Sequence, residues 1–184
     1  MTSESRDRAG DARRAYRWAV AVSCPAVADH LAVTVGRRAA RAILIDDHDR
    51  LVLIKRMKPG QAPYWTAPGG GVDDTDDSVE AALHRELAEE LGAEASDASR
   101  VFLFSSPSDA GIAVQYFFVA RLIKLDVSAR SGPEFGDPSR GGYDVDRIDL
   151  RGEGLVSIDL KPVALKEFIL ANREALLAEV AVTA

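Results

Sequence analysis

Cysteine is almost missing from the 184 residues, since Cys24 is the only one. A single thiol excludes an internal disulfide and a cysteine-rich zinc site, which fits a reducing compartment. Long apolar runs are missing as well. No stretch approaches the roughly 18 uncharged apolar residues of a membrane span, and the run at residues 18–22 is shorter than the roughly 7 to 15 residues of an export signal. We therefore expect a cytoplasmic protein without membrane contact.

Histidine and excess positive charge are also scarce. The three histidines, His30, His48 and His84, lack any spacing typical of metal ligands, so we assign them no role. The net charge is −6, whereas proteins that bind nucleic acid through a broad surface neutralise many phosphates with basic residues. No nucleic-acid partner is expected. An anionic small molecule would need local help from a bound cation.

The composition is that of a globular protein, with 47% hydrophobic and 28% charged residues. Residues 1–14 are polar and without periodicity, which predicts a mobile tail. The apolar segment that follows, up to residue 36, predicts a short structural appendage or a homodimer contact. We assign residues 1–36 to an N-terminal extension and residues 37–184 to one domain.

Strand-like runs outnumber helical patterns in that domain. Strands are predicted from the segments AARAILID, RLVLIKRM, RVFLFSS and AVQYFFVARLIKL, and near residues 147–150. Helices are predicted at residues 78–91 and, as a single closing helix, within SIDLKPVALKEFILANREALLAEV. The segment SARSGPEFGDPSRGGYD predicts a long loop. The fold class is α/β, with a mixed sheet between helices.

The helix at residues 78–91 carries the clearest chemical signal. At about 100° per residue, its leucines form one apolar stripe: Leu83, Leu87 and Leu91. Three acids crowd an adjoining arc: Glu86, Glu89 and Glu90. Like charges at this spacing repel, and partial burial raises the cost. Lysine or arginine neutralises most such patches, but Mg²⁺ or Mn²⁺ also prefers carboxylate oxygens and bridges them to phosphates.

A glycine turn just before this helix favours the cation. Gly69, Gly70 and Gly71 can adopt backbone conformations closed to other residues, so that carbonyls or amides can approach a ligand. A helix preceded by such a turn is a suitable platform for a metal or a phosphate.

The spacing of these residues resembles the signature of a known family. The Nudix box is a glycine, five residues, a glutamate, seven residues and then R-E-U-x-E-E-x-G-U, in which U is aliphatic. Residues 71–93 read GVDDTDDSVEAALHRELAEELGA. The matching positions are Gly71, Arg85, Glu86, Leu87, Glu89, Glu90 and Gly92, with Ala93 as a small final residue. The chain is thus similar to Nudix hydrolases over about residues 38–177, which implies a Nudix-like α/β/α sandwich around a mixed β-sheet.

The resemblance also implies roles for individual residues. The ligands of Mg²⁺ or Mn²⁺ would be Gly70, through its carbonyl, Glu86, Glu89 and Glu90. Arg85 would hold the acids in place, and it lies one i, i+4 step from Glu89. The family's first glutamate is replaced by Asp77, which is one methylene shorter. Asp77 or Ser78 would also serve as the N-cap of the helix.

The implied reaction is hydrolysis of the pyrophosphate linkage of a nucleoside diphosphate linked to another moiety. A bound metal would orient the pyrophosphate and lower the pKa of the attacking water. A base must take the proton, and outside the box we favour Glu134, in the long predicted loop, over Asp144 and Asp146. Each of these three, taken singly, is more readily explained as a solvated surface acid.

Substrate contacts are expected from basic residues on or after the first two strands. These are Arg41, Lys55, Arg56 and Lys58, with Gly70 and Gly71 beside them. Trp65 and Tyr116 are more typical of core residues than of base-stacking residues. Pro107 stands fourteen residues after Ala93, one short of the proline that marks ADP-ribose hydrolases. ADP-ribose or a nucleotide sugar is the first expected substrate. The alternatives are a housecleaning nucleoside triphosphate pyrophosphohydrolase and a non-catalytic nucleotide sensor.

Overall fold

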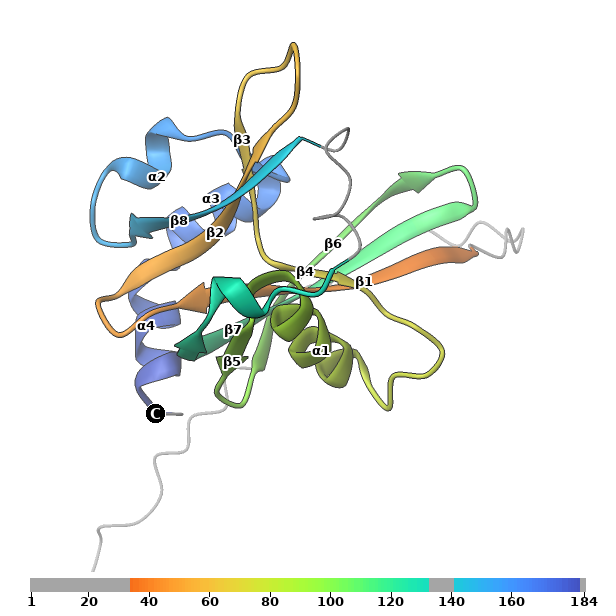
Figure 1. Ribbon diagram of the computed structural model, residues 1–184, viewed down its shortest axis with the longest axis horizontal. Helices are drawn as coiled ribbons and strands as arrows, with labels where there is room; N and C mark the ends of the chain where they lie inside the picture. The colour runs from red at the N-terminus through yellow and green to blue at the C-terminus, as the bar shows by residue number, and fades with distance from the viewer. Residues whose placement is uncertain (1–33, 133–140, 183–184) are drawn as a thin grey trace, which may run out of the picture. The chain divides into compact units, whose positions relative to one another are not determined.

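The protein is described by a computed structural model that covers residues 34–132 and 141–182 (Figure 1). The predicted tail and most of the predicted extension lie outside these residues, as does Glu134. The boundary expected after residue 36 therefore stays a prediction, although the first strand already begins at Val35. No helix of the described segments is long and apolar enough to cross a membrane.

The centre of the domain is a mixed sheet. Its strands are β1 (Val35–Ile45), β2 (Arg50–Met57), β3 (Tyr64–Thr66), β4 (Gly69–Gly71), β5 (Ala93–Ala95), β6 (Ser99–Ser108), β7 (Gly111–Leu125), β8 (Gly142–Asp149) and β9 (Leu160–Lys161). The main order is β5-β7-β1-β2-β3-β9, while β4 pairs with β1, β6 with β7 and β8 with β2. β1 runs parallel to β7, and β3 runs parallel to β9, whereas the other pairs are antiparallel. The predicted mixed sheet is confirmed.

Strand β1 changes partners along its length, and this change positions the site. In its middle, Ala39 to Arg41 pair with the glycines of β4. Near its end, Leu44 and Ile45 pair with β2. At the switch between the two partners, the Ala42 amide donates to the Pro68 carbonyl at 2.8 Å. The glycine segment is therefore fixed against the middle of the sheet.

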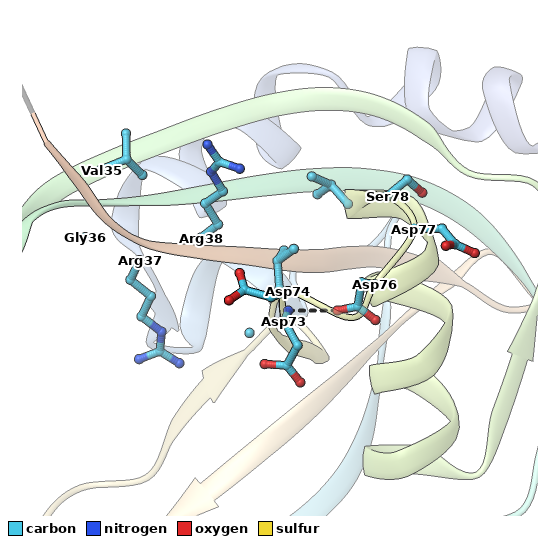
Figure 2. A pocket seen from close by; sticks show the side chains of 12 residues that line it. Val35, Gly36, Arg37, Arg38, Asp73, Asp74, Asp76, Asp77 and Ser78 are labelled. Atoms are coloured by element: carbon cyan, nitrogen blue, oxygen red, sulfur yellow. Dashed lines mark hydrogen bonds between the residues drawn. The ribbon is translucent and has the colours of Figure 1, made fainter.

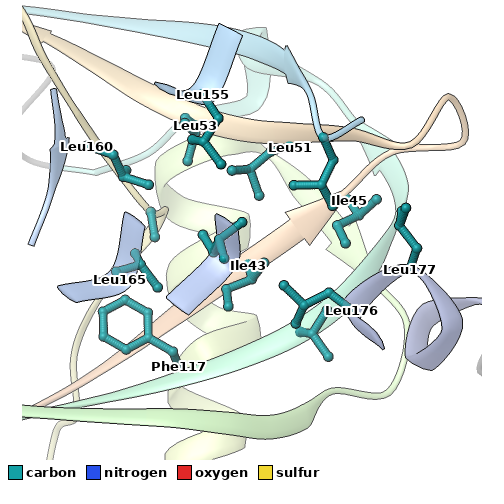
Figure 3. Packing of buried hydrophobic residues seen from close by; sticks show 14 of the residues in the cluster. Ile43, Ile45, Leu51, Leu53, Phe117, Leu155, Leu160, Leu165, Leu176 and Leu177 are labelled. Atoms are coloured by element: carbon teal, nitrogen blue, oxygen red, sulfur yellow. The ribbon is translucent and has the colours of Figure 1, made fainter. Parts of the chain in front are cut away.

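Helices cover both faces of the sheet. α1 (Val79–Leu91) packs on one face, where its leucines meet Ala42, Leu44, Val52 and Ile54. α3 (Val163–Ala171) and α4 (Arg173–Val182) pack on the other face, where Leu165, Ile169, Leu176 and Leu177 meet Ile43, Ile45, Leu51 and Phe117 (Figure 3). A short helix, α2 (Gly154–Ser157), adds Leu155 to this second core. The predicted α/β/α sandwich is confirmed.

The single closing helix predicted from the sequence is wrong, because the segment forms two helices. α3 ends at Asn172, whose amide N–H donates to the Ile169 carbonyl at 3.1 Å and whose side-chain Nδ2 donates to the Phe168 carbonyl at 2.7 Å. Asparagine competes in this way with the regular helix ladder. The break lets leucines of both helices reach the same core.

The predicted loop after β7 was too long, and the strand predicted near residues 147–150 was too short. β8 begins at Gly142 and pairs with β2 from Met57 back to Arg50. Glycine and aspartate, which are rare in strands, hide this strand in the sequence. Pairing with the buried β2 and packing of Tyr143, Val145 and Ile148 against the two cores override that weak propensity.

Candidate active site

Helix α1 begins and ends at residues suited to those positions. The Ser78 hydroxyl accepts a hydrogen bond from the Ala81 amide at 3.0 Å, so Ser78, not Asp77, is the N-cap. Gly92 ends the helix with a φ of 60°, a left-handed conformation that favours glycine. Between these caps, Leu83, Leu87 and Leu91 are fully buried. The predicted helix and its leucine stripe are confirmed.

The predicted glycine turn forms the short strand β4, and its backbone lies directly against α1. A Cβ added to Gly70 would lie 2.2 Å from Oε2 of Glu86. At Gly69 the φ is 122°, and an added Cβ would lie 2.2 Å from the Ala40 carbonyl oxygen. A side chain at either position would collide with its neighbour, so the glycines permit the close approach of β4 to the carboxylate of Glu86.

Of the three predicted metal-binding acids, Glu86 and Glu90 lie against β4, whereas Glu89 contacts Arg85. The Glu86 side chain is 16% exposed and that of Glu89 is 39% exposed. Glu90 accepts a hydrogen bond from the Gly69 amide at 2.7 Å. Burial raises the pKa of Glu86, although the neighbouring Arg85 opposes this shift. A carboxylate in such surroundings would be stabilised by more positive charge.

Arg85 lies between the acids and the glycine segment. Its Nη1 donates to Oε1 of Glu86 at 2.9 Å and to Oε2 of Glu89 at 3.3 Å, and its Nη2 donates to the Gly71 carbonyl at 3.0 Å. A planar guanidinium can satisfy several acceptors at once, because its donors form a rigid fork. Arg85 therefore joins two candidate ligands to the backbone of β4.

The sequence reasoning missed Asp76. Its two carboxylate oxygens accept hydrogen bonds from Nε and Nη2 of Arg85, both at 2.9 Å. These bonds lower the pKa of Asp76 to about 2 and, from the other side, raise the pKa of Arg85. Asp77, which occupies the family position, is exposed. The run DDTDD indicates that an aspartate precedes the helix, but spacing alone does not show which of the two adjacent aspartates, Asp76 or Asp77, pairs with Arg85.

The basic residues that are predicted to contact the substrate lie on several elements. Arg41 donates to the carbonyls of Ala67, at 3.1 Å, and Gly69, so it braces the backbone at the start of β4. Burial lowers the pKa of Arg41, while Glu90 opposes the shift. The Arg56 guanidinium lies 3.5 Å from the centre of the Tyr143 ring. Lys58 directly follows β2.

The remaining candidates lie elsewhere on the sheet. Pro107 lies on β6 opposite Ile112 and is exposed; β7 separates β6 from β1. Trp65 is half-buried, with Lys55 Nζ 5.4 Å from its ring centre, and its Nε1 donates to the Asp146 carboxylate at 2.9 Å. Asp146 therefore orients Trp65. Asp144 lies on β8 opposite Lys55.

Two hollows flank the glycine segment. A cavity of about 370 Å³ is lined by Arg41, Thr66, Ala67, Gln115, Phe117, Lys161 and Pro162. An open trough of about 760 Å³ is lined by Arg37, Arg38, Gly71 and the acidic residues before α1, among others (Figure 2). One hollow therefore borders Thr66 and Ala67 just before β4, and the other borders Gly71 at its end.

A second acidic group lies in the turn between β1 and β2. Among the described residues, Asp46, Asp47 and His48 are the only set of three whose ligand atoms lie within 4.8 Å of one another. The Asp46 carboxylate, however, accepts hydrogen bonds from the amides of His48 and Arg50, at 3.0 and 2.9 Å, and from the Arg50 side chain. These hydrogen bonds close the turn between β1 and β2, and they explain why the Asp46 carboxylate lies where it does.

The family model of the NUDIX domain matches residues 35–137. The chain belongs to the NUDIX family. No curated protein gives a significant match to the sequence. Membership of this family confirms the enzyme class predicted from residues 71–93, a Nudix pyrophosphohydrolase.

Solved structures show the same NUDIX fold. An ADP compounds hydrolase is 23% identical, with a TM-score of 0.60 over 79% of this chain and 75% of that one. The NUDIX domain of Shewanella oneidensis NrtR, complexed with ADP ribose, is 21% identical, with a TM-score of 0.56 over 80% and 93%. A MutT NUDIX hydrolase from Burkholderia pseudomallei is 24% identical, with a TM-score of 0.53 over 73% and 95%.

Proposed function

We propose that this protein uses Mg²⁺ or Mn²⁺ to hydrolyse the pyrophosphate linkage of a nucleoside diphosphate joined to another group, with ADP-ribose or a nucleotide sugar as its substrate. The observation that carries the proposal is the contact of Glu86 with both Gly70 and Arg85. This contact keeps a half-buried carboxylate at the edge of a glycine segment, where a phosphate can approach the backbone.

The donor types present suit a hard divalent cation, although the ligand atoms of Glu86, Glu89 and Glu90 do not all lie within 4.8 Å of one another in this structure. Glu86, Glu89 and Glu90 offer carboxylate oxygens, and the carbonyl of Gly70 is the fourth proposed ligand, a set of oxygen donors that Mg²⁺ and Mn²⁺ prefer. Burial raises the pKa of Glu86 while Arg85 opposes the shift, so further positive charge nearby would favour the ionised carboxylate. A bound cation would supply that charge, neutralise the pyrophosphate and activate water.

The chain's own groups position the substrate. Arg85 orients Glu86 and Glu89, while Arg41 braces the backbone of β4 through the carbonyl of Gly69. Arg56 and Lys58 are the proposed cations for the phosphates. Glu134, which lies outside the described residues, is the proposed base that takes the proton from water.

The cavity beside Arg41 is suited to the nucleoside end of the substrate. Phe117 offers an apolar wall, whereas Gln115 and Thr66 offer donors and acceptors for the edge of a base. The ADP compounds hydrolase and the domain complexed with ADP ribose support an ADP-linked substrate as the first to test. The fold shared with a MutT hydrolase supports an oxidised nucleoside triphosphate as the second.

The test is a substrate panel with Mg²⁺ or Mn²⁺ and the variant Glu90→Gln. ADP-ribose, nucleotide sugars and oxidised nucleoside triphosphates are each incubated, and the phosphate-bearing products are resolved by chromatography. We expect cleavage of at least one compound and a loss of more than about 100-fold in kcat for Glu90→Gln, because one metal ligand is removed. Glu167→Gln, at an exposed position on α3, is the matched control.

If the wild-type protein binds these nucleotides without cleaving any of them, the enzymatic proposal fails and the sensor alternative gains support. If Glu90→Gln is as active as the wild type, the assignment of the metal site fails. For the base, Glu134→Gln should lower kcat and remove the acidic limb of the pH profile. An unchanged rate and profile would exclude Glu134.

A further inference from the structure

We propose that Asp76, and not Asp77 at the family position, is the positioning residue that fixes Arg85 and thereby Glu86 and Glu89. The inference rests on the metal site of the proposed function. It differs from the resemblance, which places the supporting acid one residue later. The geometry around Arg85 carries the argument.

Arg85 uses opposite edges of its guanidinium for different partners. Nε and Nη2 form a bidentate pair with the carboxylate of Asp76, with both hydrogen bonds at 2.9 Å. Nη1 donates to Glu86 and Glu89. The pair with Asp76 sets the plane of the guanidinium, because two parallel hydrogen bonds leave little freedom to rotate. The position of Nη1 then follows from that plane.

The loop before α1 is folded so that it presents Asp76. The Asp76 amide donates to the Asp73 carbonyl at 3.0 Å, and the Asp73 amide donates back to Oδ2 of Asp76 at 2.8 Å (Figure 2). This reciprocal turn buries the Asp76 side chain to 6% exposure at Arg85. Asp76 is thus held by two backbone hydrogen bonds as well as by the arginine.

Asp77 is placed differently. It is exposed, and it immediately precedes the N-cap Ser78, at the point where the chain turns into the helix. Among the described residues, none donates a hydrogen bond to the Asp77 carboxylate. In Figure 2 its side chain lies apart from the pair formed by Asp73 and Asp76.

Loss of the Asp76 carboxylate would change the metal site through Arg85. The guanidinium would keep its positive charge but lose its main neutralising partner. It would then compete with a cation for Glu86 and Glu89, and its orientation would no longer be fixed. The expected consequence is weaker metal binding in a protein that remains folded, since Asp76 lies in the loop before α1 and neither Asp76 nor Arg85 belongs to a hydrophobic core.

The experiment compares Asp76→Asn with the matched control Asp77→Asn. Binding of Mn²⁺ to the protein without substrate is followed by electron paramagnetic resonance, and folding is followed by circular dichroism. We expect the Kd for Mn²⁺ to rise about 10- to 100-fold for Asp76→Asn, as for other residues that orient metal ligands, and to change less than about twofold for Asp77→Asn. Equal effects, or a larger effect of Asp77→Asn, would overturn the proposal.

A second measurement separates positioning from general damage. Arg85→Lys removes the planar fork, so Asp76→Asn should have little additional effect on the Kd in that background, whereas independent roles would give additive effects. If Asp76→Asn does not fold, Asp76→Glu replaces it and should shift the Kd in the same direction. A wild-type protein that binds no Mn²⁺ would refute the proposed metal site itself, which distinguishes that failure from failure of the Asp76 assignment.

Discussion

At the scale of single residues, Gly70 controls where Glu86 can lie. An added Cβ would meet only the end of the Glu86 side chain, which can rotate away. An added methyl group would therefore displace the Glu86 carboxylate but leave the fold intact. Gly71, one residue later, has open space around the same position.

We expect Gly70→Ala to lower kcat at least about tenfold, because Glu86 must leave its place beside β4, while the free energy of unfolding changes by less than about 1 kcal/mol. Steady-state kinetics and urea denaturation measure the two effects. Glu167→Gln, at an exposed position on α3, is the control and should retain activity. A loss of activity in both variants would argue against the contact with Glu86.

Asp46 is the second residue whose surroundings define its role. Its side chain is 5% exposed and pairs with Arg50 at 2.8 Å. Burial alone would raise its pKa, but hydrogen bonds from the Arg50 side chain and from the amides of Arg50 and His48 outweigh burial and lower it. We infer that this carboxylate stabilises the turn between β1 and β2.

Asp46→Asn should reduce the free energy of unfolding by about 2 to 3 kcal/mol, as expected for hydrogen bonds to a charged group. Because the folded pKa is lower than the unfolded value near 4, the stabilisation is present above about pH 4 and is lost as pH falls through the folded pKa. Urea denaturation at pH 7 and at pH 3 should show a smaller difference between variant and wild type at pH 3. A difference that does not shrink would contradict this account.

At the scale of elements, α1 combines a stable helix with an edge that carries the three proposed metal ligands. Its caps, Ser78 and Gly92, satisfy backbone groups at both ends, and its leucines bind it to the sheet. The acids can therefore lie next to one another without unwinding the helix. The positions of the acidic side chains are fixed further by contacts with β4 and with the loop before α1.

Ser78→Ala should cost about 1 kcal/mol of stability, because the Ala81 amide loses its acceptor. Thermal unfolding followed by circular dichroism would measure the change. Asp77→Ala, at the neighbouring exposed position, should cost less than about half as much. If the two substitutions lower the stability by equal amounts, Ser78 is not the dominant N-cap.

At the scale of the whole molecule, the cavity beside Arg41 exists only because distant strands meet. Arg41 comes from β1, Gln115 and Phe117 from β7, Thr66 from β3 and Lys161 from β9. No local sequence pattern joins these residues. We expect the cavity to decide which nucleoside the enzyme accepts.

Gln115→Ala should raise KM for the nucleotide substrate by about 5- to 10-fold with little change in kcat, since it removes one hydrogen-bonding group remote from the reacting phosphorus. The factor by which Gln115→Ala raises KM should differ between substrates that carry different bases. Gln61→Ala, at an exposed position after β2, is the control. An effect on kcat alone would place Gln115 in the chemistry instead of in nucleoside binding.

Helix α1, the first two strands and the family were predictable from the sequence because their signals are local. The leucine stripe, the caps and the box of residues 71–93 each depend on spacing within one short segment. The assignments of Glu86, Glu89 and Glu90 to a metal and of Glu134 to a base stay predictions. The assignment of Pro107 to the substrate, which rests on spacing alone, also stays a prediction; β7 separates its strand from the one that carries Arg41.

Tertiary structure decided what local signals could not. Two adjacent aspartates look alike in sequence, but only Asp76 reaches Arg85, because a turn with Asp73 aims it there. Pairing with β2 extends β8 through residues that disfavour strands, and both halves of the broken closing helix pack onto one core. Local periodicity thus predicted helix α1, the first two strands and the acids that α1 carries, whereas contacts between segments far apart in the chain decided which side chains meet.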